Sequence, residues 1–251
     1  MRTSPILPPW AAGLIGLAVF LAAIEAGVAL GLINGFVVPP PSALPDAFVY
    51  LWQEGDIAWP LFLTFAQGAA ATALAALVGI PIGWLLWRRP VLGAAYDPWL
   101  GALFAAPLIL LYPLFLVMFG RTYVTTIVVG FLAAVIPVIL KTREGLVAIP
   151  PVLLNVGRSF GVSPRALALK IIVPAAAPAV FTGLRLALIF ALVNIIGLEY
   201  LIDFGGLGRV VSDMYFRFQF PATYAAVVLV LLVSFTMQWA LKRLEIWIRP
   251  K

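Results

Sequence analysis

Long apolar runs dominate the pattern of this chain. Six of them alternate with short segments that are rich in proline, glycine or charge. They cover about residues 10–33, 61–87, 99–119, 123–140, 180–202 and 222–241. A helix needs about 20 apolar residues to cross the roughly 30 Å hydrocarbon core of a bilayer. The pattern therefore predicts an all-α integral membrane protein whose six transmembrane helices form a single domain, residues 1–251.

Four prolines lie inside these runs: Pro81, Pro107, Pro113 and Pro137. Proline breaks a helix in water, but in a membrane neighbouring groups satisfy the carbonyl that it frees. We therefore expect these prolines to kink their helices and not to end them. The first run exceeds the apolar core of a secretory signal, which is about 7–15 residues long, so we expect it to be retained as a helix.

The composition agrees with lipid as the main solvent. Apolar residues make up 64% of the chain and charged residues 10%, and the mean hydropathy is +1.11. Soluble domains have about 45–50% apolar and about 25% charged residues. These values exclude a water-soluble globular enzyme.

Cysteine and histidine are both absent from the sequence. Their absence removes disulfides, thiolate nucleophiles, zinc sites built from thiolate or imidazole, and the usual general base near neutral pH. We therefore expect no metal site and no catalytic residues in this chain. The composition favours transport or scaffolding over enzymatic chemistry.

Basic residues are distributed unequally between the alternate loops. With the N-terminus inside, one side of the membrane receives most of the 16 lysines and arginines. These are Arg2, Arg88, Arg89, Lys141, Arg143, Arg158, Arg165, Lys170, Lys242, Arg243, Arg249 and Lys251. Cytoplasmic loops carry the excess of positive charge in membrane proteins. The sequence therefore predicts a multi-pass membrane protein with both termini in the cytoplasm.

One predicted cytoplasmic connection, about residues 141–179, is long and not uniformly polar. Ile149, Val152, Val156 and Phe160 recur at helical spacing, which predicts an amphipathic helix. Gly161 suits a helix end in the left-handed conformation. A second short helix, residues 165–172, is expected to end at Val173-Pro174. An open alternative is a helix that only places apolar residues among the lipid headgroups.

This connection resembles the loop signature of binding-protein-dependent ATP-binding-cassette (ABC) importer permeases. The family signature is Glu-Ala-Ala, three residues, Gly, nine residues, and then Ile, any residue, Leu, Pro. This chain has the same spacing, with Asn155-Val156-Gly157, then Gly161 after three residues, and then 171–174 after nine. The segments 39–42, 79–83 and 183–185, together with Glu25, look like the branch that transports sulfonates, taurine, nitrate and pyrimidines. Asn155 stands where the family often has Glu, and Val173 where it has Leu.

The resemblance implies a type I ABC importer fold, with the loop as a coupling helix that docks on a cytoplasmic ATPase. The docking residues it implies are Val152, Asn155, Val156, Gly157, Arg158, Phe160, Gly161, Val162, Ser163, Arg165 and Pro174. It also implies a location in the bacterial inner membrane and three partners, namely the ATPase, an outer solute-binding protein and a second copy of the chain. ATP and Mg²⁺ are then held by the ATPase, and a small polar solute, often anionic, crosses by alternating access.

The source of energy distinguishes the ABC importer hypothesis from the alternative functions. The sequence contains no Gly, four residues, Gly-Lys-Ser/Thr nucleotide-binding loop. Energy must then come from a partner or from an ion gradient. A gradient-driven transporter that uses Glu25 and Glu199 is the alternative function. An intramembrane enzyme needs a pair such as Ser159 or Ser163 with Lys170, for which the sequence indicates no pocket.

Polar groups within the runs are candidates for the transport pathway. An ionisable group in a membrane is costly and therefore points to function. The candidates are Glu25, Tyr112, Thr125, Asn194 and Glu199, with Gln67, Thr72 and Thr126 as further ones. We interpret most of these as hydrogen-bonding links between helices, and we expect Glu25 to pair with a neighbouring helix or to reach the outer interface.

Helical geometry separates two of the candidates. Asn194 and Glu199 lie about 140° apart around one helix, so both cannot face the same pathway. We expect Arg185, near the inner end of that run, to extend toward the lipid phosphates. The Gly-rich segment 203–209 follows no strand and lies on the outer side, which excludes a phosphate-binding loop.

Overall fold

The computed structural model describes residues 8–54 and 57–248, and every regular element in these two ranges is helical. The long helices are α1 (Pro9–Ala29), α3 (Ala58–Arg88), α4 (Pro90–Ala105), α6 (Tyr123–Val147), α9 (Val173–Leu201) and α11 (Phe220–Ile248). The shorter ones are η1 (Pro41–Ala43), α2 (Leu44–Glu54), η2 (Leu108–Leu111), α5 (Tyr112–Phe119), α7 (Pro151–Ser159), α8 (Pro164–Leu167), the π-helical η3 (Ala168–Ile172) and α10 (Leu207–Phe216). The predicted all-α class is confirmed.

Five helices of the described residues are long and apolar enough to cross a membrane. The helices Pro90–Ala105 and Leu108–Phe119 are long and apolar enough only when taken together, and this pair is bent by 82° at a short break. The predicted single helix 99–119 is therefore wrong. Proline lacks an N–H and disfavours helical backbone in the residue before it, and Ala106, with ψ of 135°, is extended where it precedes Pro107. Pro81 and Pro137, in contrast, lie inside unbroken helices.

Two predicted helix ends near the loop are also wrong. The fourth run was expected to end at residue 140, but α6 continues to Val147, and Lys141 and Glu144 pair at 2.6 Å on its surface. The second loop helix does not end at Val173-Pro174. Val173-Pro174 follows the π-helical turn Ala168–Ile172 directly, and Pro164–Leu201 runs through it as one helix of 38 residues. The two-helix loop itself, α7 and α8, is present.

Small residues let the central helices approach closely. On α3, a Cβ at Gly79 would come within 2.8 Å of Val138, and one at Gly83 within 2.7 Å of Thr142, both on α6. Between α6 and α9, a Cβ at Gly183 would lie 3.2 Å from the carbonyl oxygen of Pro137. Membrane helices associate through such small-residue contacts because lipid gives no hydrophobic drive. Helices α3, α6 and α9 therefore form the packed centre of the protein.

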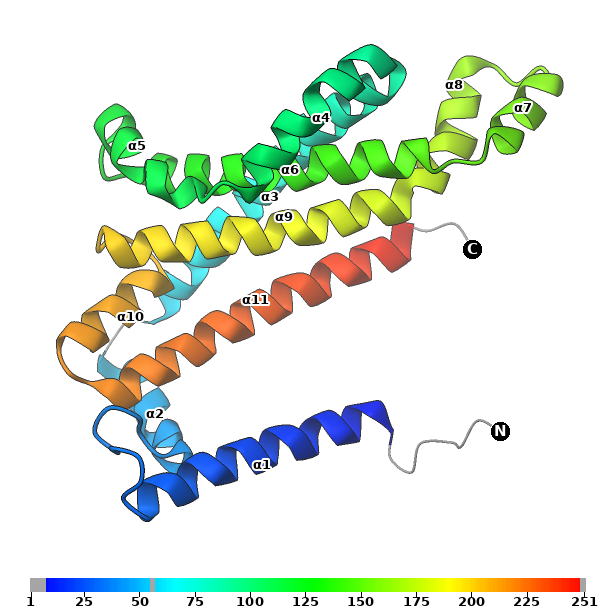
Figure 1. The fold of residues 1–251 in the computed structure, drawn as a ribbon. Coiled ribbons are helices and arrows are strands. Elements are labelled where there is room, and N and C mark those ends of the chain that lie inside the picture. The colour runs from blue at the N-terminus through cyan, green and yellow to red at the C-terminus, as the bar shows by residue number, and fades with distance from the viewer. Residues whose placement is uncertain (1–7, 55–56, 249–251) are drawn as a thin grey trace.

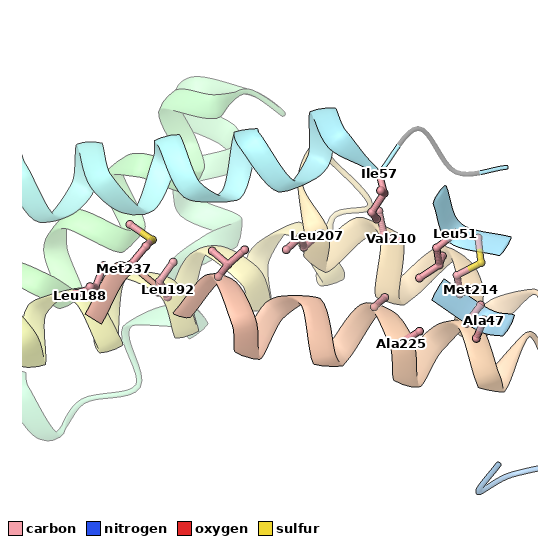
Figure 2. Close-up of a cluster of buried hydrophobic side chains, with 13 residues drawn as sticks. Ala47, Leu51, Ile57, Leu188, Leu192, Leu207, Val210, Met214, Ala225 and Met237 are labelled. Atoms are coloured by element: carbon pink, nitrogen blue, oxygen red, sulfur yellow. The ribbon is translucent and has the colours of Figure 1, made fainter. Parts of the chain in front are cut away.

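A second buried cluster joins α9 and α11 to the short helices α2 and α10. Figure 2 shows Leu207, Val210 and Met214 of α10 in one buried cluster with Leu51 of α2 and Ala225 of α11. All five side chains are buried. Helix α10 is thus anchored by its apolar face to three other elements.

Helix α1 stands apart from this bundle (Figure 1). None of its most apolar 18-residue window is buried within the chain. Its recorded link is to η1, where Glu25 accepts hydrogen bonds from the backbone N–H of Ser42 at 3.1 Å and from its hydroxyl at 2.7 Å. Glu25 therefore pairs with η1, the short helix that follows its own span.

The bundle has two distinct ends (Figure 1). One holds α7 and α8 together with the start of α1 and the end of α11, and we call it the α7 end. The opposite end, called the α10 end, holds α10, α2 and α5. The candidate sites fall at these two ends and at the break between α4 and α5.

Candidate functional site

Helix α7 lies at one end of the bundle, outside the long apolar helices. It ends just before Gly161, whose φ is +66°. The N–H of Gly161 donates to the carbonyl of Arg158 at 2.9 Å. The N–H of Val162 donates to the carbonyl of Gly157 at 3.1 Å. These bonds and the left-handed glycine terminate the helix and turn the chain toward α8.

The apolar side of α7 faces away from the rest of the protein. Val152, Val156 and Phe160 are exposed, the last at 82%. The opposite side of α7 packs closely on α8. Gly157 is buried there, and a Cβ at this position would press on Leu167. Clustered exposed apolar side chains mark an interaction site. This α7 surface, defined by the three exposed residues, is the first candidate site.

The structure distributes the predicted docking residues around this loop. The exposed ones are Val152, Asn155, Val156, Arg158, Phe160, Gly161, Ser163 and Arg165. Gly157 is buried, and Val162 and Pro174 are half-buried. Ser163 also has a local role, because its hydroxyl accepts the N–H of Ala166 at 3.4 Å and caps α8.

The α10 end contains a fully buried carboxylate, Glu199 of α9. Its oxygens accept the hydroxyl of Thr64 at 2.9 Å and the side-chain amide of Gln67 at 3.0 Å, both from α3. They also accept the backbone N–H of Gly208 at 3.0 Å. A buried carboxylate is stable only when it is hydrogen-bonded in this way. The side chain of Glu199 is therefore bound entirely by protein donors.

The partners of Glu199 are themselves bonded to other helices. The hydroxyl of Thr64 accepts the N–H of Leu207 at 2.8 Å, at the start of α10. The side-chain carbonyl of Gln67 accepts the hydroxyl of Thr126 from α6. Four helices, α3, α6, α9 and α10, thus meet in one hydrogen-bonded network, which we call the Glu199 network.

Two glycines make room for this network. A Cβ at Gly206 would collide with the oxygens of Thr64 and Glu199. A Cβ at Gly208 would collide with the carbonyl of Ile196. Because Gly208 lies in the first turn of α10, the Glu199 carboxylate also stands at the positive end of that helix. The Gly-rich segment 203–209 therefore closes over a carboxylate.

The other pathway candidates lie elsewhere. Thr125 is buried and donates to the carbonyl of Gly120 at 2.6 Å, while Tyr112 is half-buried at the start of α5. Asn194 donates to the carbonyl of Phe190 at 2.8 Å and lines a cleft of about 290 Å³. The cleft is formed beside the break at Pro107 and is otherwise mostly apolar. Asn194 and Glu199 face different neighbours.

Near the α7 end, Arg185 of α9 does not extend to lipid as expected. It pairs with Glu245 of α11 at 3.0 Å, and its backbone carbonyl accepts the amide of Gln238 at 3.1 Å. The expectation failed because the sixth run was assigned to residues 222–241, whereas α11 continues to Ile248 and brings Glu245 onto the helix. An ion pair therefore links α9 to α11.

An exposed group of charges at the α10 end was missed by the sequence reasoning. Asp203 lies 3.6 Å from Arg121 and 3.5 Å from Arg209. These residues line an open cavity of about 450 Å³ together with Tyr123 and Phe204. One carboxylate thus faces two guanidinium groups, and the cavity carries an excess of positive charge.

Known proteins resemble this chain along most of its length. It is 31% identical over 226 residues to the bicarbonate transport system permease protein CmpB of Synechocystis sp., covering 85% of this chain and 78% of that protein. It is 32% identical over 155 residues to the nitrate import permease protein NrtB of Synechococcus elongatus, covering 62% of this chain and 56% of that protein.

Among solved structures, a chain of the MetNI methionine ABC transporter in an inward facing conformation has the same fold. The match covers 74% of this chain and 93% of that chain, with a TM-score of 0.64 at 19% identity. A family profile described as "Binding-protein-dependent transport system inner membrane component" matches residues 75–250. The chain therefore belongs to the family of binding-protein-dependent transport system inner membrane components.

Proposed function

We propose that this chain imports a small polar anion and that the exposed apolar surface of α7 receives the ATPase that drives it. The chain is the permease subunit of an ATP-driven ABC importer, and a separate subunit hydrolyses ATP. The observation that carries the docking proposal is the exposure of Val152, Val156 and Phe160 on a helix that lies outside the spans. ATP and Mg²⁺ are bound by the ATPase and not by this chain.

Two observations support an anion as the solute. The relatives CmpB and NrtB are named for bicarbonate and nitrate, both small oxyanions. The open cavity at the α10 end has two guanidinium groups, from Arg121 and Arg209, facing one carboxylate. A positively charged mouth raises the local concentration of an anion.

The α7 end is assigned to the cytoplasm. Among the described residues it carries most of the cations: Arg88, Arg89, Lys141, Arg143, Arg158, Arg165, Lys170, Lys242 and Arg243. The α10 end carries Arg121, Arg209 and Arg217. The positive-inside rule then places α7 beside the ATPase and both chain ends in the cytoplasm. The α10 end faces the solute-binding protein.

The transporting unit is assigned as a homodimer. A single chain has no cavity that crosses the bundle among its described pockets. The cleft beside Asn194 and the unburied helix α1 leave apolar surface for a second copy. Two copies would form the pathway between them and alternate between inward-open and outward-open states, with nucleotide and loaded binding protein shifting the balance.

The docking proposal is tested by changing the α7 surface. A tagged chain is solubilised from native membranes in mild detergent, and the proteins that remain bound are identified by mass spectrometry. We expect about one ATPase subunit per copy with the unchanged chain. Replacing Phe160→Asp puts a charge in the apolar contact and should remove the ATPase. The matched control is Val91→Asp, which is 82% exposed at the same end but lies on α4.

The outcomes separate the parts of the proposal. Loss of the ATPase with Phe160→Asp but not with Val91→Asp supports docking on α7. Retention with both variants contradicts that surface. Repeated absence of any ATPase from the unchanged chain contradicts the partner assignment itself.

A further inference from the structure

We propose that Glu199 is a positioning residue for transport, which fixes α10 to the outer end of α9 so that a signal from the solute-binding protein reaches α7. The proposal rests on the proposed function for its partners and its orientation. It assigns a role to a buried carboxylate that would otherwise be read as an ion or solute site.

The first step is that Glu199 has no free capacity for a solute. Its side chain is fully buried. It accepts hydrogen bonds from a hydroxyl, an amide and a backbone N–H at 2.9–3.1 Å. Of the cavities described, the ones at the α10 end are lined by Gly205 and Arg209, and Glu199 lines none of them. The carboxylate therefore acts on the protein and not on the transported anion.

The second step is that the network fixes the start of α10 in particular. The N–H groups of Leu207 and Gly208 are held by Thr64 and Glu199. These are first-turn donors that a helix cannot satisfy within itself. Without Glu199, the donor of Gly208 and the amide of Gln67 would be buried without their recorded acceptor. The start of α10 would then separate from α3 more easily.

The third step is that α10 presents the outer surface. Its apolar face packs on α2 and α11, as Figure 2 shows for Val210 and Met214. Its other face carries Arg209, Asp213 and Arg217, of which Asp213 and Arg217 pair at 2.8 Å. A protein that binds the outer face therefore meets the charged side of α10.

The fourth step is that Glu199 and α8, which packs beside α7, belong to one continuous helix. Pro164–Leu201 is continuous through the π-helical turn Ala168–Ile172. Glu199 lies two residues before its outer end. At the inner end, Leu167 packs against Gly157 of α7. Displacement of α10 is therefore transmitted to α7 through a single helix, provided that the Glu199 network holds.

The test uses the complex with its ATPase in lipid nanodiscs. ATP hydrolysis is measured with and without solute-loaded binding protein for the unchanged chain, Glu199→Ala, Glu199→Gln and Asp97→Asn. We expect Glu199→Ala to lower the ratio of stimulated to basal hydrolysis by about fivefold or more, in the range of coupling between distant sites. Gln keeps one acceptor oxygen and should restore part of the ratio. Asp97→Asn, an acid-to-amide change in an exposed pair of α4 with Arg143 of α6, should keep it.

A second measurement covers the protein without its partners. Hydrogen exchange of Leu207–Phe216 in the purified chain should become about tenfold faster in Glu199→Ala, because local opening becomes easier. Exchange of Pro151–Ser159 should stay unchanged. Thr64→Val, a milder change to the same network, should give the same pattern if Glu199→Ala does not fold.

Two results would overturn the proposal. One is an unchanged exchange rate in α10. The other is an unchanged stimulation ratio in complexes that assemble normally, which leaves the carboxylate a role in stability alone. If the unchanged chain retains no ATPase, the proposed function fails, while the exchange measurement still decides whether Glu199 holds α10.

Discussion

Gly161 shows how one residue sets the shape of the docking loop. No atom beyond its chain neighbours lies within 4 Å of the position that a Cβ would take. Space therefore does not require glycine there. The backbone does, since a φ of +66° is reached without penalty only by glycine and is tolerated by asparagine.

This leads to a prediction about side-chain shape at Gly161. Gly161→Val should cost about 1–2 kcal/mol in the left-handed conformation, change the end of α7 and lower the amount of ATPase that copurifies. Gly161→Asn adds a side chain of similar size but tolerates this conformation, so it should retain the ATPase. If both variants lose the ATPase equally, crowding against the partner and not backbone conformation is the cause.

At the level of helices, the ion pair between Arg185 and Glu245 links α9 to α11 within the apolar part of the bundle. Arg185 is 35% exposed at its side chain and Glu245 9%. Removing one partner of a largely buried pair takes away charge compensation from the other. The pair therefore constrains how α11 can move relative to α9.

We expect Arg185→Ala to destabilise the protein by about 2 kcal/mol, below the cost of breaking a fully buried pair because the arginine is partly exposed. The change would appear as a lower melting temperature in detergent. The exchanged pair Arg185→Glu with Glu245→Arg should recover most of the loss. A single variant as stable as the unchanged chain would contradict the assigned linkage.

The sequence predicted the helices well because the thickness of the bilayer sets the length of an apolar run. It did not predict the break at Pro107, since a proline in a membrane can kink or end a helix according to its neighbours. The Glu199 network could not be predicted from the sequence for another reason. Thr64 and Gln67 lie 135 and 132 residues from Glu199 in the chain, and no local pattern records such contacts. Candidate polar residues were identifiable, but their partners were not.

For the whole molecule, the assigned orientation places two sets of exposed side chains on opposite sides of the membrane. Phe218 follows α10 and is exposed, while Phe160 and Val91 are exposed at the α7 end. The chain contains no cysteine. A single introduced cysteine is therefore the only thiol that a reagent can label.

We expect Phe218→Cys to react with a membrane-impermeant maleimide added to intact spheroplasts. Phe160→Cys and Val91→Cys should react only after the membrane is permeabilised. With the ATPase bound, Phe160→Cys should be protected and Val91→Cys should not. The reverse pattern of labelling in intact spheroplasts would invert the assigned orientation.

The length of α9 has a mechanical consequence. Its 29 residues extend about 44 Å at 1.5 Å per residue. If α9 pivots near the Glu199 network, a rotation of about 10° carries its other end through roughly 8 Å, by the geometry of a rod of that length. The helix is then a lever with its fulcrum at the outer surface. A large stroke beside the ATPase leaves the fulcrum almost still, so one rotation can open the inner side while the outer side stays shut.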